Sequence, residues 1–339
     1  MSATAPAPWI TSQARQLLGQ RGHAWLLAGP SGLGQYSLAM ALARAWLCEQ
    51  RSVDGACGTC GSCHAIEVRT HADLCVLMPE TSMLELAWPL AERAQSEIDE
   101  KKRKASKEIR IEAMRDAVEF SQRTSARGRG KAVLIFPAER MNAITANALL
   151  KTLEEPPGDV RFVLASGASH LLLPTIRSRC LGHRMVWPEH EAAIAWVGLQ
   201  GLAGDDATVL LRAAGGRPDD AVALARSGRT ARSWRQFPAA MARGDVEWVK
   251  DWSAAQIVDA LQKLCHDMAA ALTGATPRFF ETADLPARGS VAALTAWSNA
   301  LGKTMRTVEH PFNPGLMQEA LVSQAQSALN STPQPSFSV

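Results

Sequence analysis

One short stretch, residues 29–36, constrains the fold more than any other part of this chain of 339 residues. It reads Gly-Pro-Ser-Gly-Leu-Gly-Gln-Tyr and follows an apolar run, residues 24–28, that predicts a buried strand. The residues after it, 35–49, carry apolar side chains at helical spacing and predict a helix. Gly29, four residues and Gly34, placed between a strand and a helix, form the frame of a phosphate-binding loop.

The two residues after the second glycine lack the chemistry of a working loop. In such a loop a lysine reaches the outer phosphates, and a Ser or Thr hydroxyl ligates Mg²⁺. This chain has Gln35 and Tyr36 there. A neutral amide cannot neutralise phosphate charge, and a phenol carries its oxygen too far from the backbone to replace a Ser hydroxyl. We therefore expect a degenerate loop in which ATP is not bound or not hydrolysed.

A second part of the same kind of site is also altered. The apolar run 132–136 predicts a strand that runs into Pro137, where a metal-binding Asp is expected. Proline has no carboxylate and no backbone donor. Glu139, two residues on, is interpreted as a solvated loop residue. Because two parts of one site have changed together, the chain is not expected to hydrolyse nucleoside triphosphates by itself.

The cysteines form the strongest chemical pattern in the sequence. Cys57, Cys60 and Cys63 are spaced by two residues each, and Cys48 precedes them at the end of the predicted helix. Four thiolates joined by short loops suit a tetrahedral, structural Zn²⁺ site. The alternatives are four free thiols, which clustering makes prone to oxidation, or His64 in place of one thiol, which its adjacency to Cys63 would strain. The remaining cysteines, interpreted as packing residues, are Cys75, Cys180 and Cys265.

Composition bounds the class of protein. The chain is 47% hydrophobic and 20% charged with a net charge of +3, which is typical of a globular protein of two or three domains and does not by itself indicate a nucleic-acid partner. No apolar run approaches the roughly 20 residues that span a bilayer. The N-terminus has no secretion signal, so the chain is expected to be cytoplasmic and to have no membrane partner.

Alternating strands and helices predict a parallel α/β sheet covered on both faces, followed by an all-helical part. Two basic clusters interrupt the first part, at residues 101–104 and at 123–131. They are interpreted as solvated, with DNA contact as the alternative. Further strands are predicted at 72–77 and 161–165, short helices at 189–200, 205–213 and 218–227, and longer ones over 234–330, with 246–273 the clearest.

The sequence resembles the delta-prime subunit of the bacterial DNA polymerase III clamp loader, a member of the AAA+ class. The resemblance rests on the four cysteines, on residues 146–157 (Ala-Asn-Ala-Leu-Leu-Lys-Thr-Leu-Glu-Glu-Pro-Pro) and on residues 175–180 (Thr-Ile-Arg-Ser-Arg-Cys). It extends over roughly residues 10–230. The implied domains are an AAA+ domain with a zinc module (1–186), a three-helix lid (187–228), a helical collar (229–330) and a disordered tail (331–339).

The resemblance implies a non-hydrolysing subunit at one end of a five-subunit ring. Arg179 would act as an arginine finger on ATP bound by a neighbouring motor subunit (gamma or tau). The other implied partners are the delta subunit, the sliding clamp and primed DNA, within a DNA-directed DNA polymerase holoenzyme that acts in replication. Ser166 occupies the place of a phosphate-sensing residue, and Asp219 that of a further arginine of the motors. The charged segment 92–108 is longer than the family usually has and receives no role.

Two other functions stay open. The first is an active AAA+ motor, which Gln35, Tyr36 and Pro137 disfavour. The second is a zinc-dependent nucleic-acid binding module that uses the basic clusters. ATP turnover by the isolated chain would favour the first, and tight, salt-sensitive DNA binding would favour the second.

Overall fold

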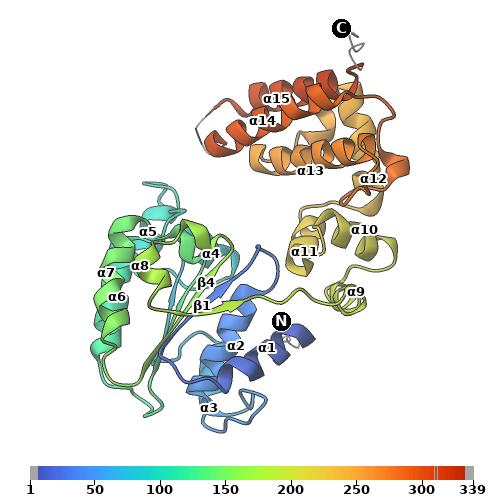
Figure 1. The fold of residues 1–339 in the computed structure, drawn as a ribbon. Helices are drawn as coiled ribbons and strands as arrows, with labels where there is room; N and C mark the ends of the chain where they lie inside the picture. Colours follow the sequence, from blue (N-terminus) through green and yellow to red (C-terminus); the bar gives the residue numbers. More distant parts are fainter. Residues whose placement is uncertain (1–6, 309, 311, 333–339) are drawn as a thin grey trace. The chain divides into compact units, whose positions relative to one another are not determined.

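The computed structural model describes residues 7–308, 310 and 312–332, and the chain forms two compact units, Met1–Ala192 and Ala193–Val339 (Figure 1). Within the described residues no helix is both long and apolar enough to cross a membrane. The predicted tail, 331–339, lies outside the described residues except for Ser331 and Thr332.

The first unit is built on a five-stranded sheet in which every pairing is parallel, in the order β2-β3-β4-β1-β5. The three central strands are almost completely buried, as expected for parallel strands covered on both faces. The pairing of β1 with β4 brings Ala28 opposite Ser166. The strands are β1 (Ala24–Ala28), β2 (Leu74–Leu77), β3 (Lys131–Ile135), β4 (Val160–Ser166) and β5 (Leu181–Arg184).

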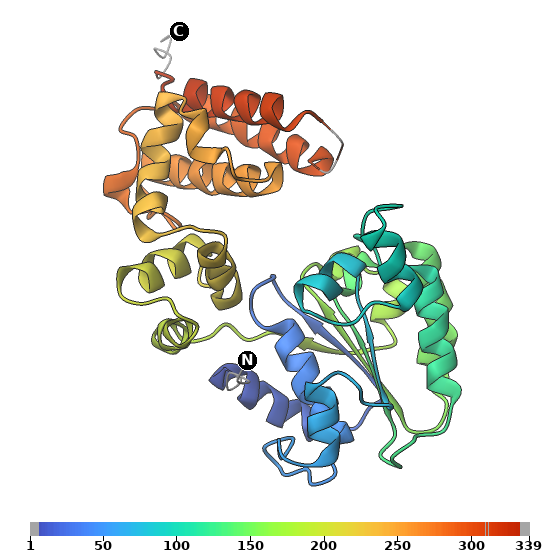
Figure 2. The same cartoon turned by 180° about the vertical axis from the view of Figure 1, so that it is seen from behind.

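Helices cover both faces of this sheet. Figures 1 and 2 show α1 (Pro8–Leu18) and α2 (Gln35–Leu47) on one face, and α6 (Ile111–Gln122) and α7 (Ala143–Glu154) on the other. Asn142 caps α7, as its sequence predicts, by accepting a hydrogen bond from the Thr145 backbone. The shorter helices of this unit are α3 (Gly61–Glu67), α4 (Glu80–Glu85), α5 (Glu92–Asp99), α8 (Pro174–Arg177) and the 3₁₀ turns η1 (Ala138–Arg140) and η2 (Ser169–Leu171).

The charged segment after α4 is anchored at one point. Arg103 donates to both carboxylate oxygens of Glu80, at 2.5 and 2.8 Å, and to Glu97 at 2.7 Å. Burial alone would raise the pKa of Glu80, but the hydrogen bonds from Arg103 and from the Ser106 backbone outweigh it and lower that pKa. One basic residue of the 101–104 cluster therefore has a structural role.

The second unit is helical throughout its described residues, and one continuous apolar core joins its helices. A single helix over 246–273 was predicted, and this is wrong. The structure has a 3₁₀ turn, η3 (Val246–Val249), and then a new helix that starts after Ser253, whose hydroxyl accepts from the Gln256 backbone in a capping box. The helices are α9 (His190–Leu199), α10 (Asp205–Ala213), α11 (Pro218–Arg226), α12 (Ala231–Arg243), α13 (Ala254–Leu272), α14 (Val291–Thr307) and α15 (Pro314–Leu329), with a 3₁₀ turn η4 (Thr282–Asp284).

The predicted fold class is confirmed in its main parts: a parallel α/β domain that carries a cysteine-rich module, followed by an all-helical part. Because the core of the second unit runs without interruption from α9 to α15, the boundary between lid and collar at 228 stays a prediction.

Candidate functional site

The glycine loop lies at the carboxyl ends of β1 and β4, where parallel sheets place their binding sites. Gly34 adopts φ 90°, a left-handed conformation that suits glycine, and it caps the N-terminus of α2. Gly29 donates to the Ser166 carbonyl at 3.3 Å. Gly29 also lies so close to Met185 that a Cβ on it would come within 2.8 Å of the Met185 Cβ. The frame of a phosphate-binding loop is therefore present.

The Gln35 side chain is folded back into this loop. Its Nε2 donates to the carbonyl of Gly29 at 2.9 Å and to that of Pro30 at 2.5 Å, and the residue is only 4% exposed. A lysine at this position extends toward the phosphates of a nucleotide. Here the amide instead crosslinks the loop to itself.

Tyr36 packs against the end of the strand that should carry the metal-binding acid. Its ring centroid lies 5.4 Å from that of Phe136, the residue just before Pro137. Its hydroxyl accepts a hydrogen bond from the Trp88 indole at 2.7 Å. Burial raises the pKa of Tyr36. The residue at the position of the motor hydroxyl thus packs on Phe136 and bonds to Trp88, and Pro137, at the expected place of the acid, offers no carboxylate to a metal.

Glu139 was predicted to be a solvated loop residue, and the structure corrects this. The turn η1 places its Oε1 at 3.0 Å from the Gly167 backbone nitrogen, just beyond the end of β4. Its Oε2 is buried and has no hydrogen-bond partner among the described residues. Because a Cβ on Gly167 would lie 3.1 Å from Glu139 Oε1 and 3.6 Å from the Ser31 backbone nitrogen, this carboxylate lies beside the glycine loop.

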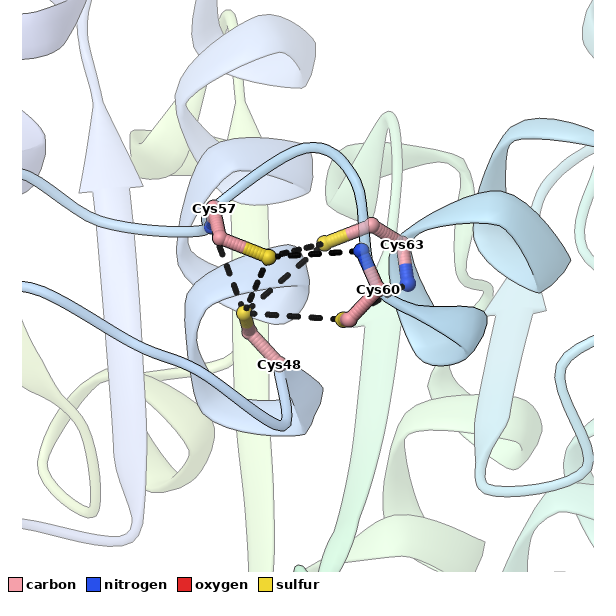
Figure 3. A group of neighbouring side chains, drawn as sticks. All are labelled: Cys48, Cys57, Cys60 and Cys63. Carbon is pink, nitrogen blue, oxygen red and sulfur yellow. Dashed lines mark hydrogen bonds between the residues drawn. The ribbon is translucent and has the colours of Figure 1, made fainter.

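The four predicted metal ligands come together in one cluster (Figure 3). The Cys48 sulfur lies 3.5 Å from that of Cys57 and 3.8 Å from those of Cys60 and Cys63, and the Cys57 and Cys63 sulfurs are 4.0 Å apart. A tetrahedral ion with metal–sulfur bonds of about 2.3 Å requires sulfur–sulfur edges of about 3.8 Å. The cluster therefore fits a tetrahedral metal ion. His64 is exposed and does not belong to it.

The local fold explains how the cluster forms. Cys48 ends α2, Cys60 caps α3, and Cys63 lies in the first turn of α3. Hydrogen bonds from the Thr59 and Cys60 backbones lower the pKa of Cys57 to about 6, and burial raises that of Cys63 to about 12. The three remaining cysteines lie elsewhere, and burial raises the pKa of each thiol; they are Cys75, Cys180 and Cys265.

The second basic cluster is engaged within the chain, and two of its members anchor the cysteine module. Arg127 pairs with Glu49 at 2.9 Å, and Glu49 in turn accepts from the Ser62 backbone at the start of α3. Arg129 donates to the Glu49 carbonyl at 2.7 Å. The other two members pair with Glu119 (Arg123) and with Asp73 (Lys131).

Arg179 follows α8 and is 31% exposed. Its Nε donates to Glu154 Oε1 at 2.6 Å, its Nη2 contacts the same oxygen, and its Nη1 donates to the Thr175 carbonyl at 2.9 Å. Arg179 therefore forms a surface ion pair with Glu154, at the end of α7. Sequence reasoning did not single out Glu154, although it lies in the motif 146–157.

The two remaining candidate residues lie in different units. Ser166 is fully buried at the end of β4, and its Oγ accepts from the Ala168 backbone at 3.2 Å. Asp219 lies in the first turn of α11 in the second unit. Burial and the neighbouring Asp220 raise the pKa of Asp219 to about 6.

Comparisons with known proteins agree with the resemblance. A family model described as DNA polymerase III, delta subunit, matches residues 10–186. The DNA polymerase III subunit delta' of Pseudomonas aeruginosa is 39% identical over 192 residues, which cover 56% of this chain and 52% of that protein. The delta' protein of Escherichia coli is 31% identical over 223 residues, which cover 64% and 60%.

Proteins named as another subunit of DNA polymerase III are also similar. The DNA polymerase III subunit tau of Salmonella typhimurium is 36% identical over 164 residues, which cover 48% of this chain and 22% of that protein. The chain spans about half the length of the delta' protein of Pseudomonas aeruginosa. Because the family model matches more than half of the chain, the chain belongs to the family described as DNA polymerase III, delta subunit, as a delta'-type member.

Proposed function

We propose that this chain is a non-hydrolysing clamp-loader subunit that supplies Arg179 in trans to the ATP site of a neighbouring motor subunit. Its partners would be the gamma or tau motors, the delta subunit, the sliding clamp and primed DNA. The chain would act within the cytoplasmic polymerase assembly without catalysing nucleotide hydrolysis itself. Membership of the delta' family supports the clamp-loader setting.

The observation that carries the proposal is the position of the Gln35 amide. It binds the carbonyls of Gly29 and Pro30, so it lies within the loop that would receive a phosphate. Phosphate requires positive charge and hydrogen-bond donors from the loop. A neutral side chain held at this place supplies neither. The Tyr36 side chain supports the same conclusion, because its ring packs on Phe136 and its hydroxyl is bound by the Trp88 indole.

The contacts of Arg179 suit an arginine finger whose guanidinium is oriented before the partner's ATP site forms around it. Glu154 and the Thr175 carbonyl fix the guanidinium without burying it. An exposed ion pair of this type contributes only about 0–1 kcal/mol. A γ-phosphate in a partner's site can therefore replace Glu154 at little cost. Arginine fingers accelerate hydrolysis by about 10³ to 10⁵.

Reconstitution with the motor and delta subunits and the clamp tests the role of Arg179. We expect Arg179→Ala to leave ring assembly intact on gel filtration and to remove the DNA-stimulated ATPase contribution of the adjoining site. Arg177→Ala is the matched control, since Arg177 lies two residues earlier and is exposed. Equal ATPase rates in the Arg179→Ala and control rings would contradict the proposal.

We also propose that the ion of the cysteine cluster is Zn²⁺ with a structural role. Four thiolates would hold it, which leaves no position for water or substrate. The ion would crosslink the end of α2 to α3.

The two alternatives receive less support. A motor would need a cation at position 35 and an acid at the position that Pro137 occupies after β3. A nucleic-acid binding module would draw on the basic clusters, but Lys131 is buried in its pair with Asp73, and Arg127 and Arg129 hold Glu49 beside the cysteine module. Nucleotide turnover and salt-dependent DNA binding by the isolated chain would respectively test these alternatives.

A further inference from the structure

A cavity of about 500 Å³ lies on the first unit, beside the cysteine module. Its floor is formed by α1, α2 and α3, of which Figure 1 shows α2 between the other two. Apolar side chains of these helices line it, among them Ile10, Met40 and Ile66. A volume of this size lies within the ~300–1,000 Å³ that is usual for binding pockets.

The two guanidinium groups of this cavity lack anionic partners. Arg44 has no hydrogen-bond or ion-pair partner among the described residues, and its Nε is buried. Within the described part of the chain, the Arg69 guanidinium contacts only the Trp88 ring, whose centroid lies 5.1 Å from its guanidinium carbon. A buried donor without a partner is unfavourable, so a ligand that supplies an acceptor to Arg44 would be favoured.

The acidic residues of the lining do not cancel this charge. Asp54 is already paired with Arg15 at 2.5 Å. Glu67 has no ion-pair partner among the described residues. The unpaired charges of the lining are therefore one carboxylate and two guanidinium groups, a net charge of about +1. The cavity is therefore suited to an anionic ligand.

The charges lie at opposite ends of an apolar floor. Arg69 approaches Trp88, which binds the Tyr36 hydroxyl, so Arg69 lies at the Tyr36 end of α2. Arg44 lies eight residues further along the same helix. At about 1.5 Å per residue, eight helical residues correspond to about 12 Å. The hydroxyl of Tyr36 accepts from Trp88, so its own hydrogen is free to be donated to an acid at that end.

An extended peptide matches this spacing. Its residues rise about 3.3 Å each, and side chains at i, i+2 and i+4 point to one side. Residues i and i+4 are then about 13 Å apart, close to the rise of about 12 Å along α2 from the Tyr36 backbone to the Arg44 backbone. The cavity also continues into a second groove that shares Arg69 and Trp88 and exposes Val68 and Leu84, as an extended occupant would require.

We infer that this cavity binds a short extended segment of a partner protein that carries acidic side chains at i and i+4 and an apolar side chain at i+2. The acids bind Arg44 at one end and Arg69 with Tyr36 at the other, and the apolar side chain packs on Met40 and Ile66. This inference does not depend on the role proposed for Arg179.

The test uses the full chain with labelled methionine methyl groups and tryptophan indoles, observed by NMR. The probe is a pool of pentapeptides, acetyl-Asp-Ser-X-Ser-Asp-amide, in which X is Leu, Ile, Met or Phe. The control pool has Asn in place of both Asp residues. We expect the Met40 methyl and the Trp88 indole to shift with the acidic pool and much less with the neutral pool.

Two variants locate the binding. Arg44→Gln and Arg69→Gln should each weaken binding of the acidic pool about tenfold or more, the usual effect of losing a charge-assisted hydrogen bond. Folding should be preserved, because Arg44 makes no polar contact with the described chain. Arg123→Gln is the control, since Arg123 follows α6 on the opposite face of the sheet. Equal shifts with both pools, no shift of Met40 and Trp88, or unchanged affinity in both variants would overturn the inference.

Discussion

The buried ion pair of Asp73 and Lys131 gives the sharpest stability prediction. These residues lie just before β2 and at the start of β3, and they are 0% and 5% exposed. Asp73 accepts hydrogen bonds from the Ser125 hydroxyl at 3.0 Å, from the Ala126 and Arg127 backbones at 2.8 and 2.9 Å, and from the Lys131 ammonium at 3.3 Å. One carboxylate thus holds both the strand and the loop that carries Arg127 to the cysteine module.

The substitution Asp73→Asn keeps the shape of the side chain and removes its charge. The Lys131 ammonium is then a buried cation without a counter-ion. One carboxylate oxygen also becomes an amide nitrogen, which cannot accept the hydrogen bonds that the backbone donates there. Breaking one side of a buried pair costs about 3–5 kcal/mol. Since each 1.4 kcal/mol is a factor of ten, amide hydrogens of β2 and β3 should exchange about 10² to 10⁴ times faster.

Hydrogen exchange followed by mass spectrometry on the full chain measures this effect in the peptides that contain β2 and β3. The double variant with Lys131→Met should recover part of the loss, because it removes the unpaired cation. Asp159→Asn is the control, since Asp159 is largely exposed and pairs with Arg161 on the surface. A change of less than fivefold in Asp73→Asn would refute the reasoning.

The same carboxyl gives the sign of a pH effect. Burial alone would raise the pKa of Asp73 from its ordinary 3.8, but the hydrogen bonds from Ala126, Arg127, Ser125 and Lys131 outweigh burial and lower it. A carboxyl with a lowered folded pKa stabilises fully above its unfolded pKa, and this contribution is lost as the pH falls through the folded pKa. The difference in exchange between wild type and Asp73→Asn, corrected for intrinsic rates, should therefore narrow as the pH falls below 3.8.

Three further outcomes are expected. Elemental analysis of the purified chain should find one Zn²⁺ per chain. Cys60→Ser should lower this content, because three thiolates hold the ion less tightly. Full retention of zinc in Cys60→Ser would contradict a four-thiolate site. The double variant Gln35→Lys, Tyr36→Thr should still show no ATP turnover by the isolated chain, because Pro137 still stands where a motor has its metal-binding acid. Turnover at a motor's rate would contradict this. Arg103→Ala should speed proteolysis within residues 100–108, because the anchor on Glu80 is lost, and an unchanged cleavage pattern would contradict it.

The sequence predicted the buried strands because their composition reflects their burial. Strands β1, β3 and β4 are nearly continuous apolar runs, as expected at the centre of a parallel sheet. The edge strand β5 was missed, because Leu-Gly-His-Arg is mostly exposed and has no apolar pattern. The start of α13 inside the long predicted helix could have been predicted, since Ser253 and Gln256 have the spacing of a capping box.

In the candidate sites, contacts between residues close in the sequence could be predicted, and contacts between distant residues could not. The cysteine ligands were predicted because all four lie within sixteen consecutive residues and their spacing carries the signal. The contact of Tyr36 with Trp88 joins residues 52 positions apart, and the contact of Glu139 with Gly167 joins residues 28 apart. Without the fold, no periodicity or spacing in the sequence points to such pairs.

Gln35 and Tyr36, which stand where a motor has its lysine and hydroxyl, make contacts that support the local fold. The Gln35 amide donates to two backbone carbonyls of the same loop, those of Gly29 and Pro30. The Tyr36 ring packs on Phe136, and its hydroxyl accepts from Trp88, which lines the cavity. Restoring the motor residues would remove these contacts as well as add charge. A loop that had merely lost its catalytic residues would tolerate that exchange, whereas this loop should be destabilised by it. The Gln35→Lys, Tyr36→Thr variant can thus separate the two views, because faster hydrogen exchange around the loop and Trp88 is expected only if these side chains now support the fold.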